Sequence, residues 1–190
     1  MIKLEKAGAG LPKFERNFLR YIIVPFVRVF FTWDLAVLFL KREVRLIENL
    51  VKNTSKEKRN ISKIITRTLA IEDDSRRNSI NQTLEHLIIA GTLVKNVIET
   101  LSKEEKFIEE IKIENVKAYG DDENQLELFL EFYNNYFEFI TQLPKKQSIM
   151  KHRHPWFVEF NNFDWSVFMY MHTFVHRRQI EQILKELDNE

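Results

Sequence analysis

Residues 165–187 read WSVFMYMHTFVHRRQIEQILKEL, and the order of apolar and polar side chains in this stretch indicates the fold. Its apolar residues recur three and four positions apart, the spacing that places side chains on one face of an α-helix. They are Trp165, Phe168, Met169, Ile180, Ile183 and Leu187. The stretch therefore predicts a long amphipathic helix, for which the preceding residues Asn161, Asn162 and Asp164 are candidate N-caps.

Other parts of the chain show the same helical spacing, and no alternating strand pattern of useful length competes with it. Four Gly and four Pro among 190 residues leave few turns, so the elements should be long. Further helices are expected over about 32–53, 72–101 and 126–140, with a short helical piece at 62–69 and a turn at 119–122. Together these elements predict an all-α protein, a four-helix bundle with longish connections.

The composition excludes several classes of function. The chain has 29 Lys and Arg against 28 Asp and Glu, whereas a nucleic-acid-binding domain usually carries a basic excess or stripe. It has no Cys, which excludes disulfides, zinc–thiolate sites and thiol nucleophiles of its own. No apolar core of signal-peptide length precedes Pro12. We therefore expect a cytoplasmic protein with no nucleic-acid partner.

The segment from Phe18 to Leu40 is long enough to raise the question of a membrane span. It contains Arg20, Arg28 and Asp34, and a charge at the centre of a bilayer costs about 2.5–3.5 kcal/mol. Pro25 is expected to break a soluble helix near that point. We predict no integral span but an amphipathic lead-in and a core helix. Docking on a membrane surface or a partner is the alternative, because aromatic residues and Arg in one amphipathic run suit an interface.

Three of the five His lie on helix faces that should turn inward. His172 and His176 are four residues apart, so they point the same way and interrupt the apolar stripe of their helix. His86 precedes Ala90 and Leu93 at helical spacing on the second expected helix. Three imidazoles on facing helices predict a three-nitrogen metal site with open coordination positions. The alternative is three core histidines, each hydrogen-bonded to a carbonyl or hydroxyl group.

The residues around these histidines resemble the signature of the DinB/YfiT-like superfamily. In that family a His-Pro-x-Phe stretch precedes a helix with His-x-x-x-His, an arginine and Gln-Ile, as residues 154–157 and 172–180 do here. A His-Leu pair in the family's second helix corresponds to His86 and Leu87. The resemblance implies that His86, His172 and His176 are a metal triad.

The same resemblance implies a domain organisation. Residues 31–190 would be a DinB-like bundle with a long crossover, preceded by an aromatic-rich N-terminal extension, residues 1–30, which matches nothing in the family. Val158 also departs from the family, which commonly has glycine after His-Pro-x-Phe.

A neutral three-histidine site leaves a divalent ion electrophilic. A water activated by the ion would make the protein a hydrolase of esters or amides. The resemblance implies instead a low-molecular-weight thiol as cofactor, and thiol-dependent S-transfer to a small-molecule substrate. Nitrogen ligands suit zinc, nickel, copper and iron, and zinc or nickel are the ions we expect first. No residue is assigned as a catalytic acid or base.

Arg153 and His154 are candidates for binding that cofactor. They lie in a basic loop with Lys145, Lys146 and Lys151, which suits the carboxylates of a thiol cofactor. The alternative is a solvated loop that His154 anchors. For the whole protein, the competing interpretation is a non-catalytic helical interaction module or peripheral membrane module. Because such bundles often dimerise, a homodimer is also considered.

Overall fold

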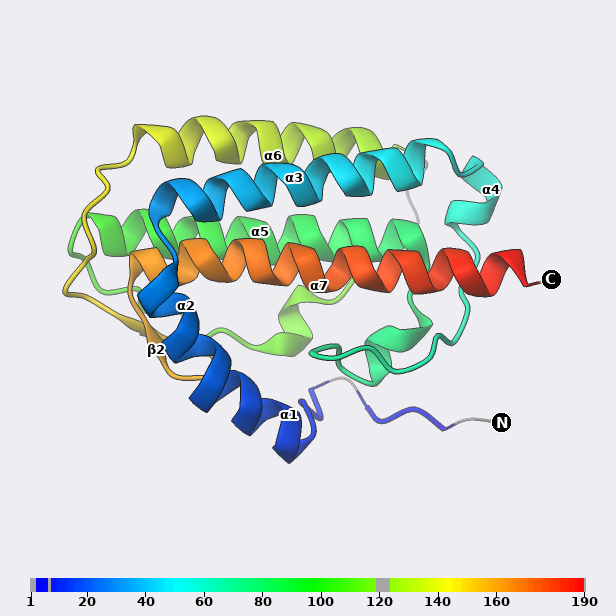
Figure 1. Ribbon diagram of the computed structural model, residues 1–190, viewed down its shortest axis with the longest axis horizontal. Coiled ribbons are helices and arrows are strands. Elements are labelled where there is room, and N and C mark those ends of the chain that lie inside the picture. The colour runs from blue at the N-terminus through cyan, green and yellow to red at the C-terminus, as the bar shows by residue number, and fades with distance from the viewer. Residues whose placement is uncertain (1–2, 7, 119–123, 190) are drawn as a thin grey trace.

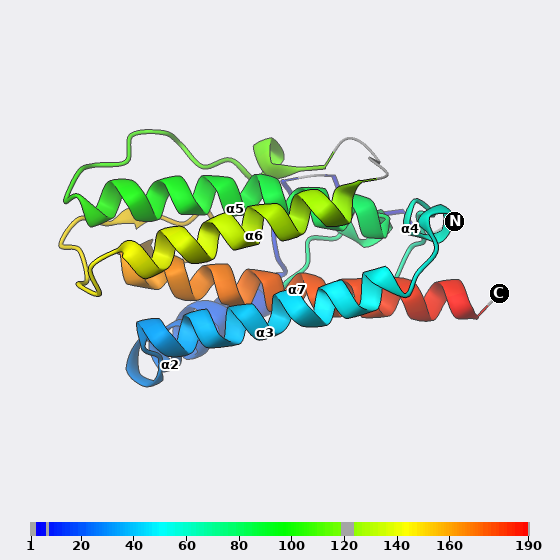
Figure 2. The ribbon, with the colours of Figure 1, turned by 90° about the horizontal axis from the view of Figure 1, so that it is seen from above.

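The computed structural model describes residues 3–6, 8–118 and 124–189, and these residues are mostly helical, as predicted. Four long helices lie side by side (Figures 1 and 2). They are α3 (Trp33–Lys52), α5 (Ile80–Ser102), α6 (Gln125–Gln142) and α7 (Asn162–Asp188). We refer to these four helices as the helical body. The turn expected at 119–122 lies outside the described residues.

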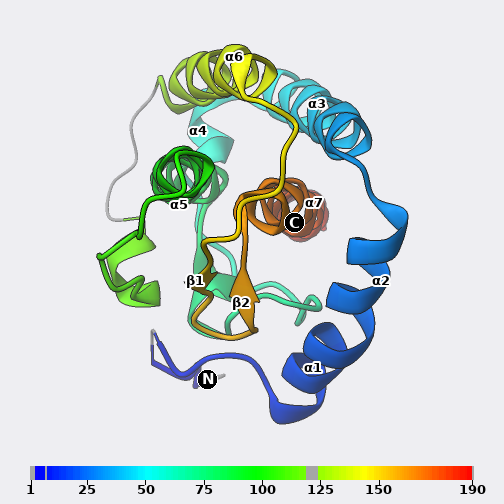
Figure 3. The ribbon, with the colours of Figure 1, turned by 90° about the vertical axis from the view of Figure 1, so that its left-hand side faces the viewer.

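The helical body encloses one main core. Helix α7 contacts both α3 and α5, and α6 contacts the same two helices from the other side (Figure 3). Side chains from all four helices meet inside and are fully buried, among them Ile47, Leu87, Phe129 and Ile180. Burial of each such side chain contributes about 1.5–3 kcal/mol, so the apolar stripes seen in the sequence hold the helices together.

Side chains fix where the long helices begin. The Thr32 hydroxyl accepts a hydrogen bond from the Leu35 amide at the start of α3. Asn161 caps α7 as one half of a capping box, with Asp164 as the other half, which confirms the prediction of a cap in this stretch. Helix α5 has the same arrangement between Ser79 and Gln82.

Two expectations for the chain ahead of α5 are wrong. The acidic residues from Glu72 do not start the helix, because Glu72 binds Lys117 at 2.6 Å and Asp73 binds Arg76 at 2.7 Å. Only a 3₁₀ turn, η2 (Asp74–Arg77), forms there. Residues 62–69 are not helical; the Ile65 carbonyl accepts from the Arg76 guanidinium instead.

Short elements occupy the connections. These are α4 (Lys56–Arg59), the 3₁₀ turn η3 (Ile113–Val116) and the strands β1 (His152–Arg153) and β2 (Glu159–Phe160). The two strands form an antiparallel hairpin in which His152 pairs with Phe160. The hairpin lies beside the first turns of α7 (Figure 3).

The N-terminal part of the chain forms a helix that crosses the outside of the helical body. It consists of α1 (Lys13–Phe18), the π-helical turn η1 (Leu19–Ile23) and α2 (Val24–Phe30), which follow one another without a break. We refer to these residues, 13–30, as the N-terminal helix. The prediction that Pro25 breaks the helix is wrong. The wider turn, in which the Val24 amide donates to the Leu19 carbonyl, accommodates a residue that lacks an N–H group.

Two arginines attach the N-terminal helix to the rest of the protein. Arg20 donates to the Phe157 carbonyl in the hairpin, at 3.0 Å. Arg28 makes a two-pronged hydrogen bond to the Asp164 carboxylate, at 2.7 and 3.0 Å, and also donates to the Glu159 carbonyl. Two of the three charges that argued against a membrane span, Arg20 and Arg28, therefore have partners within the protein.

Among the described residues, no single helix is both long enough and apolar enough to cross a membrane. The pair Lys13–Phe30 and Trp33–Lys52 passes the same test of length and composition only when the two are taken together, and the chain bends by 112° between them.

A buried ion pair joins α3 to α7. Glu43, only 2 % exposed, accepts a hydrogen bond from Arg177, which also binds Glu181 one turn further along α7. Removing one member of a buried pair leaves the other charge without compensation. This contact therefore fixes the position of α3 against the helix that carries two of the candidate ligands.

We expect Glu43→Gln to lower the free energy of unfolding by about 3 kcal/mol, because the largely buried Arg177 guanidinium loses its buried partner and keeps only Glu181, which is 41 % exposed. Urea unfolding followed by circular dichroism measures this. Glu99→Gln is the matched control, since Glu99 forms ion pairs with Lys95 and Lys103 at the surface and should change stability little. Equal effects of the two substitutions would contradict a structural role for Glu43.

Candidate metal centre

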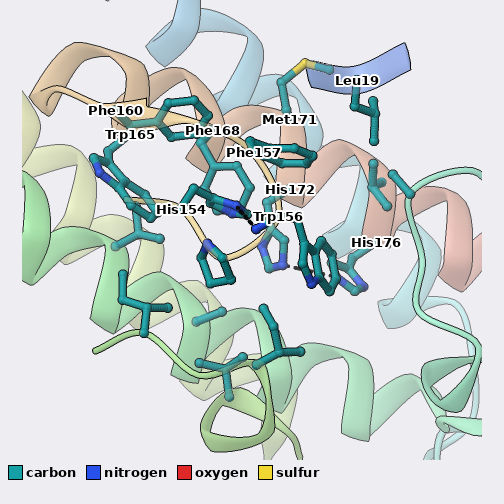
Figure 4. A pocket seen from close by; sticks show the side chains of 18 of the residues that line it. Leu19, His154, Trp156, Phe157, Phe160, Trp165, Phe168, Met171, His172 and His176 are labelled. Atoms are coloured by element: carbon teal, nitrogen blue, oxygen red, sulfur yellow. Dashed lines mark hydrogen bonds between the residues drawn. The ribbon is translucent and has the colours of Figure 1, made fainter. Parts of the chain in front are cut away.

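The three predicted histidines meet between α5 and α7. His86 lies in the second turn of α5, and His172 and His176 lie one turn apart near the middle of α7. The Nε2 atom of His172 is 3.1 Å from that of His86 and 3.2 Å from that of His176. Figure 4 shows His172 and His176 side by side at the wall of a pocket. The contact between α5 and α7 brings together residues that are 86 and 90 positions apart in the chain.

The spacing of the three nitrogens fits a metal ion. A zinc ion lies about 2.0–2.1 Å from each imidazole nitrogen, so two nitrogens on adjacent tetrahedral positions are about 3.3 Å apart. The two Nε2 separations at His172 are close to this value. Potential ligand atoms of all three residues lie within 4.8 Å of one another. The group could therefore hold one metal ion, as the sequence predicted.

Hydrogen bonds at the far side of two rings orient them. The Nδ1–H group of His86 donates to the Val116 carbonyl, and that of His176 donates to Oε1 of Gln179 at 2.7 Å. Nε2 of Gln179 donates in turn to the Ser75 carbonyl, also at 2.7 Å. Because Nδ1 carries the proton, Nε2 keeps a free lone pair, which is the form that binds metals.

The surroundings keep the three imidazoles neutral. Burial lowers the pKa of His86 to about 4. Burial, and then the neighbouring imidazoles, lower the pKa of His172 and of His176 well below the usual value. All three rings are therefore uncharged near pH 7, and none repels a cation.

A largely apolar cavity of about 160 Å³ adjoins the triad, and all three histidines line it. Helix α7 contributes Phe168 and Met171, the hairpin contributes Trp156 and Phe157, and the N-terminal helix contributes Leu19 (Figure 4). A volume near 150 Å³ is enough to hold a molecule of the size of benzene. The side of the triad that faces this cavity is where a small ligand has access.

The two residues predicted to bind a cofactor differ in their positions. His154 lines the cavity, is only 3 % exposed, and stacks on Phe157 with ring centroids 4.5 Å apart. Its Nδ1 accepts from the Trp156 amide, and burial lowers its pKa to about 3, so it is a neutral residue that anchors the hairpin. Arg153 is exposed and is not among the residues that line the cavity.

Three parts of the site were not predicted from the sequence. Gln179 belongs to the Gln-Ile pair of the sequence motif, and its spacing of three residues from His176, which places both on one helix face, is the signal that could have identified it. The carbonyl of Val116 and the cover formed by the N-terminal helix come from irregular or unassigned segments, and no sequence pattern indicated either.

Comparisons of this chain with protein-family models, with curated proteins and with solved structures found no match.

We expect Gln179→Leu to weaken zinc binding about 10- to 100-fold, because the His176 ring loses the acceptor that orients it. Competition with a chromophoric chelator measures the affinity. Gln182→Leu is the matched control, since Gln182 is on the same helix but belongs neither to the triad nor to the residues that line the cavity, and it should leave affinity unchanged. If Gln179→Leu stays folded and binds zinc like the control, Gln179 does not orient a ligand.

Proposed function

We propose that this chain is a divalent-metal-binding protein of the DinB-like type, with its long helices arranged as a four-helix bundle with a long crossover. His86, His172 and His176 are its metal ligands, with zinc or nickel as the ion. The protein acts in the cytoplasm as a thiol-dependent S-transferase or as a hydrolase on a small-molecule substrate.

One observation carries this proposal. Three Nε2 atoms from two helices converge at separations of 3.1 and 3.2 Å, and at least two of the rings are held by hydrogen bonds at their opposite nitrogen. Core histidines that merely fill space satisfy their nitrogens with carbonyl or hydroxyl groups. Here the Nε2 atoms face one another, which is the arrangement expected around a shared cation.

A divalent ion held by three neutral imidazoles supplies a Lewis acid that lowers the pKa of a coordinated water or thiol. The chain's own residues supply the surroundings. Leu19, Trp156 and Phe168 form apolar walls that bind the apolar part of a substrate and exclude bulk water. On the polar side of the cavity, Lys117 is held by Glu72 at 2.6 Å, and its ammonium group is thereby kept in an ion pair.

Tag-free protein should bind one zinc or nickel ion per chain, measured by elemental analysis and by calorimetric titration. His86→Ala, His172→Ala and His176→Ala should each reduce the affinity at least about 100-fold, because each removes one of three ligands. At 100 times the dissociation constant, the ion should raise the free energy of unfolding by about 2.7 kcal/mol.

His152→Ala is the matched control for these variants, because His152 lies on β1 and does not belong to the triad. It should bind metal like the unmodified protein. If the unmodified protein binds no divalent ion, or if all four variants bind equally, the three histidines are core residues and the metal-dependent function is wrong.

Cobalt-loaded protein distinguishes the thiol-dependent reaction from hydrolysis. If a low-molecular-weight thiol is the cofactor, adding one should produce the near-ultraviolet absorption of a cobalt–thiolate bond, and His172→Ala protein should not show it. A loaded protein whose spectrum no thiol changes would favour the hydrolase.

A further inference from the structure

The outer face of the N-terminal helix is an unusually apolar surface. Its exposed side chains form what we refer to as the aromatic stripe: Phe14, Phe18, Tyr21, Ile22, Phe26, Val29 and Phe30. Phe14, Val29 and Phe30 are 81 %, 75 % and 61 % exposed. Large apolar side chains scattered singly over a surface are ordinary, but a continuous row along one helix marks an interaction site.

The stripe is not needed to hold the N-terminal helix in place. The opposite face supplies Leu19, Ile23, Val24 and Val27 to the cavity, and the arginine contacts to the hairpin and α7 attach the helix at two points. In Figures 1 and 3 the helix runs along the outside of the molecule, and none of the described elements covers its outer side. The stripe is therefore free to meet a surface outside this chain.

The first thirty residues, which carry the stripe, are basic. Residues 1–30 contain six Lys and Arg and two Asp and Glu, which leaves 23 basic and 26 acidic residues for 31–190. The near-neutral total thus hides a net +4 in the first thirty residues and a net −3 in the rest. Within the helix the one acidic residue, Glu15, is neutralised by two hydrogen bonds from Arg67, at 3.0 and 3.1 Å.

Lys13 and Arg16 form no ion pair with the described part of the chain, and Arg20 is bonded to a carbonyl and not to an acidic side chain. Cations beside a row of exposed aromatic side chains are typical of a helix that lies in the interface of an anionic bilayer. A second copy packed stripe against stripe would instead place like charges of the two helices against each other.

We propose that the protein docks on anionic phospholipid membranes, with the aromatic stripe of the N-terminal helix inserted into the headgroup region. The helix lies flat on the bilayer and does not cross it. Because the inner face of the same helix closes the cavity beside the histidine triad, docking places the cavity next to the lipid phase. The proposal does not depend on metal binding.

Flotation of the full chain with phosphatidylcholine vesicles, with and without phosphatidylglycerol, tests this. The protein should float with the anionic vesicles, and less of it at high salt, since salt screens the cations. Lys13→Gln/Arg16→Gln should weaken partition on the order of 25-fold, about fivefold for each cation removed. Phe26→Ser/Phe30→Ser should weaken it roughly tenfold or more, because two inserted rings are lost.

Ile108→Ser/Leu128→Ser is the matched control, since it removes two exposed apolar side chains, 86 % and 43 % exposed, from other segments. It should float like the unmodified protein, and circular dichroism should show all variants folded. No flotation, or equal flotation of the control and the Phe26→Ser/Phe30→Ser variant, would overturn the proposal. So would a dimer in ultracentrifugation that this variant dissociates without any vesicle binding, because the stripe would then join two copies.

Discussion

The contact between α5 and α7 at three buried imidazoles is the constraint on which the rest of the structure depends. Bringing the Nε2 atoms of His86 and His176 to within about hydrogen-bond distance of His172 requires both helices to have one particular register. The hydrogen bonds to Val116 and Gln179 fix the rings, and the second of these continues to the segment that leads into α5. The segments on either side of α5 thus orient the site, and the site in turn holds these segments in place.

Helical periodicity was enough to predict the long helices, because a stripe of apolar side chains must be buried whatever the details of its neighbours. The same spacing put His172 and His176 together, and the inward face put His86 opposite them. The predicted start of the second helix was wrong because its acidic residues had other possible partners: Glu72 and Asp73 bind basic side chains and do not cap a helix. The predicted break at Pro25 was wrong because a π-helical turn carries the chain past it. The Val116 carbonyl could not be predicted as a partner of His86, because a backbone acceptor has no sequence signature.

The N-terminal helix has two apolar faces with different partners. Its inner face lines the cavity, and its outer face carries exposed aromatic side chains. A helix that is apolar nearly all round is usually buried in a core or in lipid. The N-terminal helix is buried on its inner face only. Its two arginines keep it attached, because they bind carbonyl groups of the hairpin and the Asp164 carboxylate of α7. The aromatic side chains of the protein are thus divided between core, cavity and surface.

Asp164 belongs to two structures at once, because it closes the capping box of α7 and also receives Arg28 of the N-terminal helix. The first turn of the ligand-bearing helix and the cover of the cavity therefore share one buried carboxylate. A truncated chain that begins at residue 31 would lose the cation while keeping the anion, and the uncompensated charge would sit two turns from His172. For protein engineering, the boundary between residues 30 and 31 is therefore a poor place to divide the molecule or to exchange segments with another helical protein.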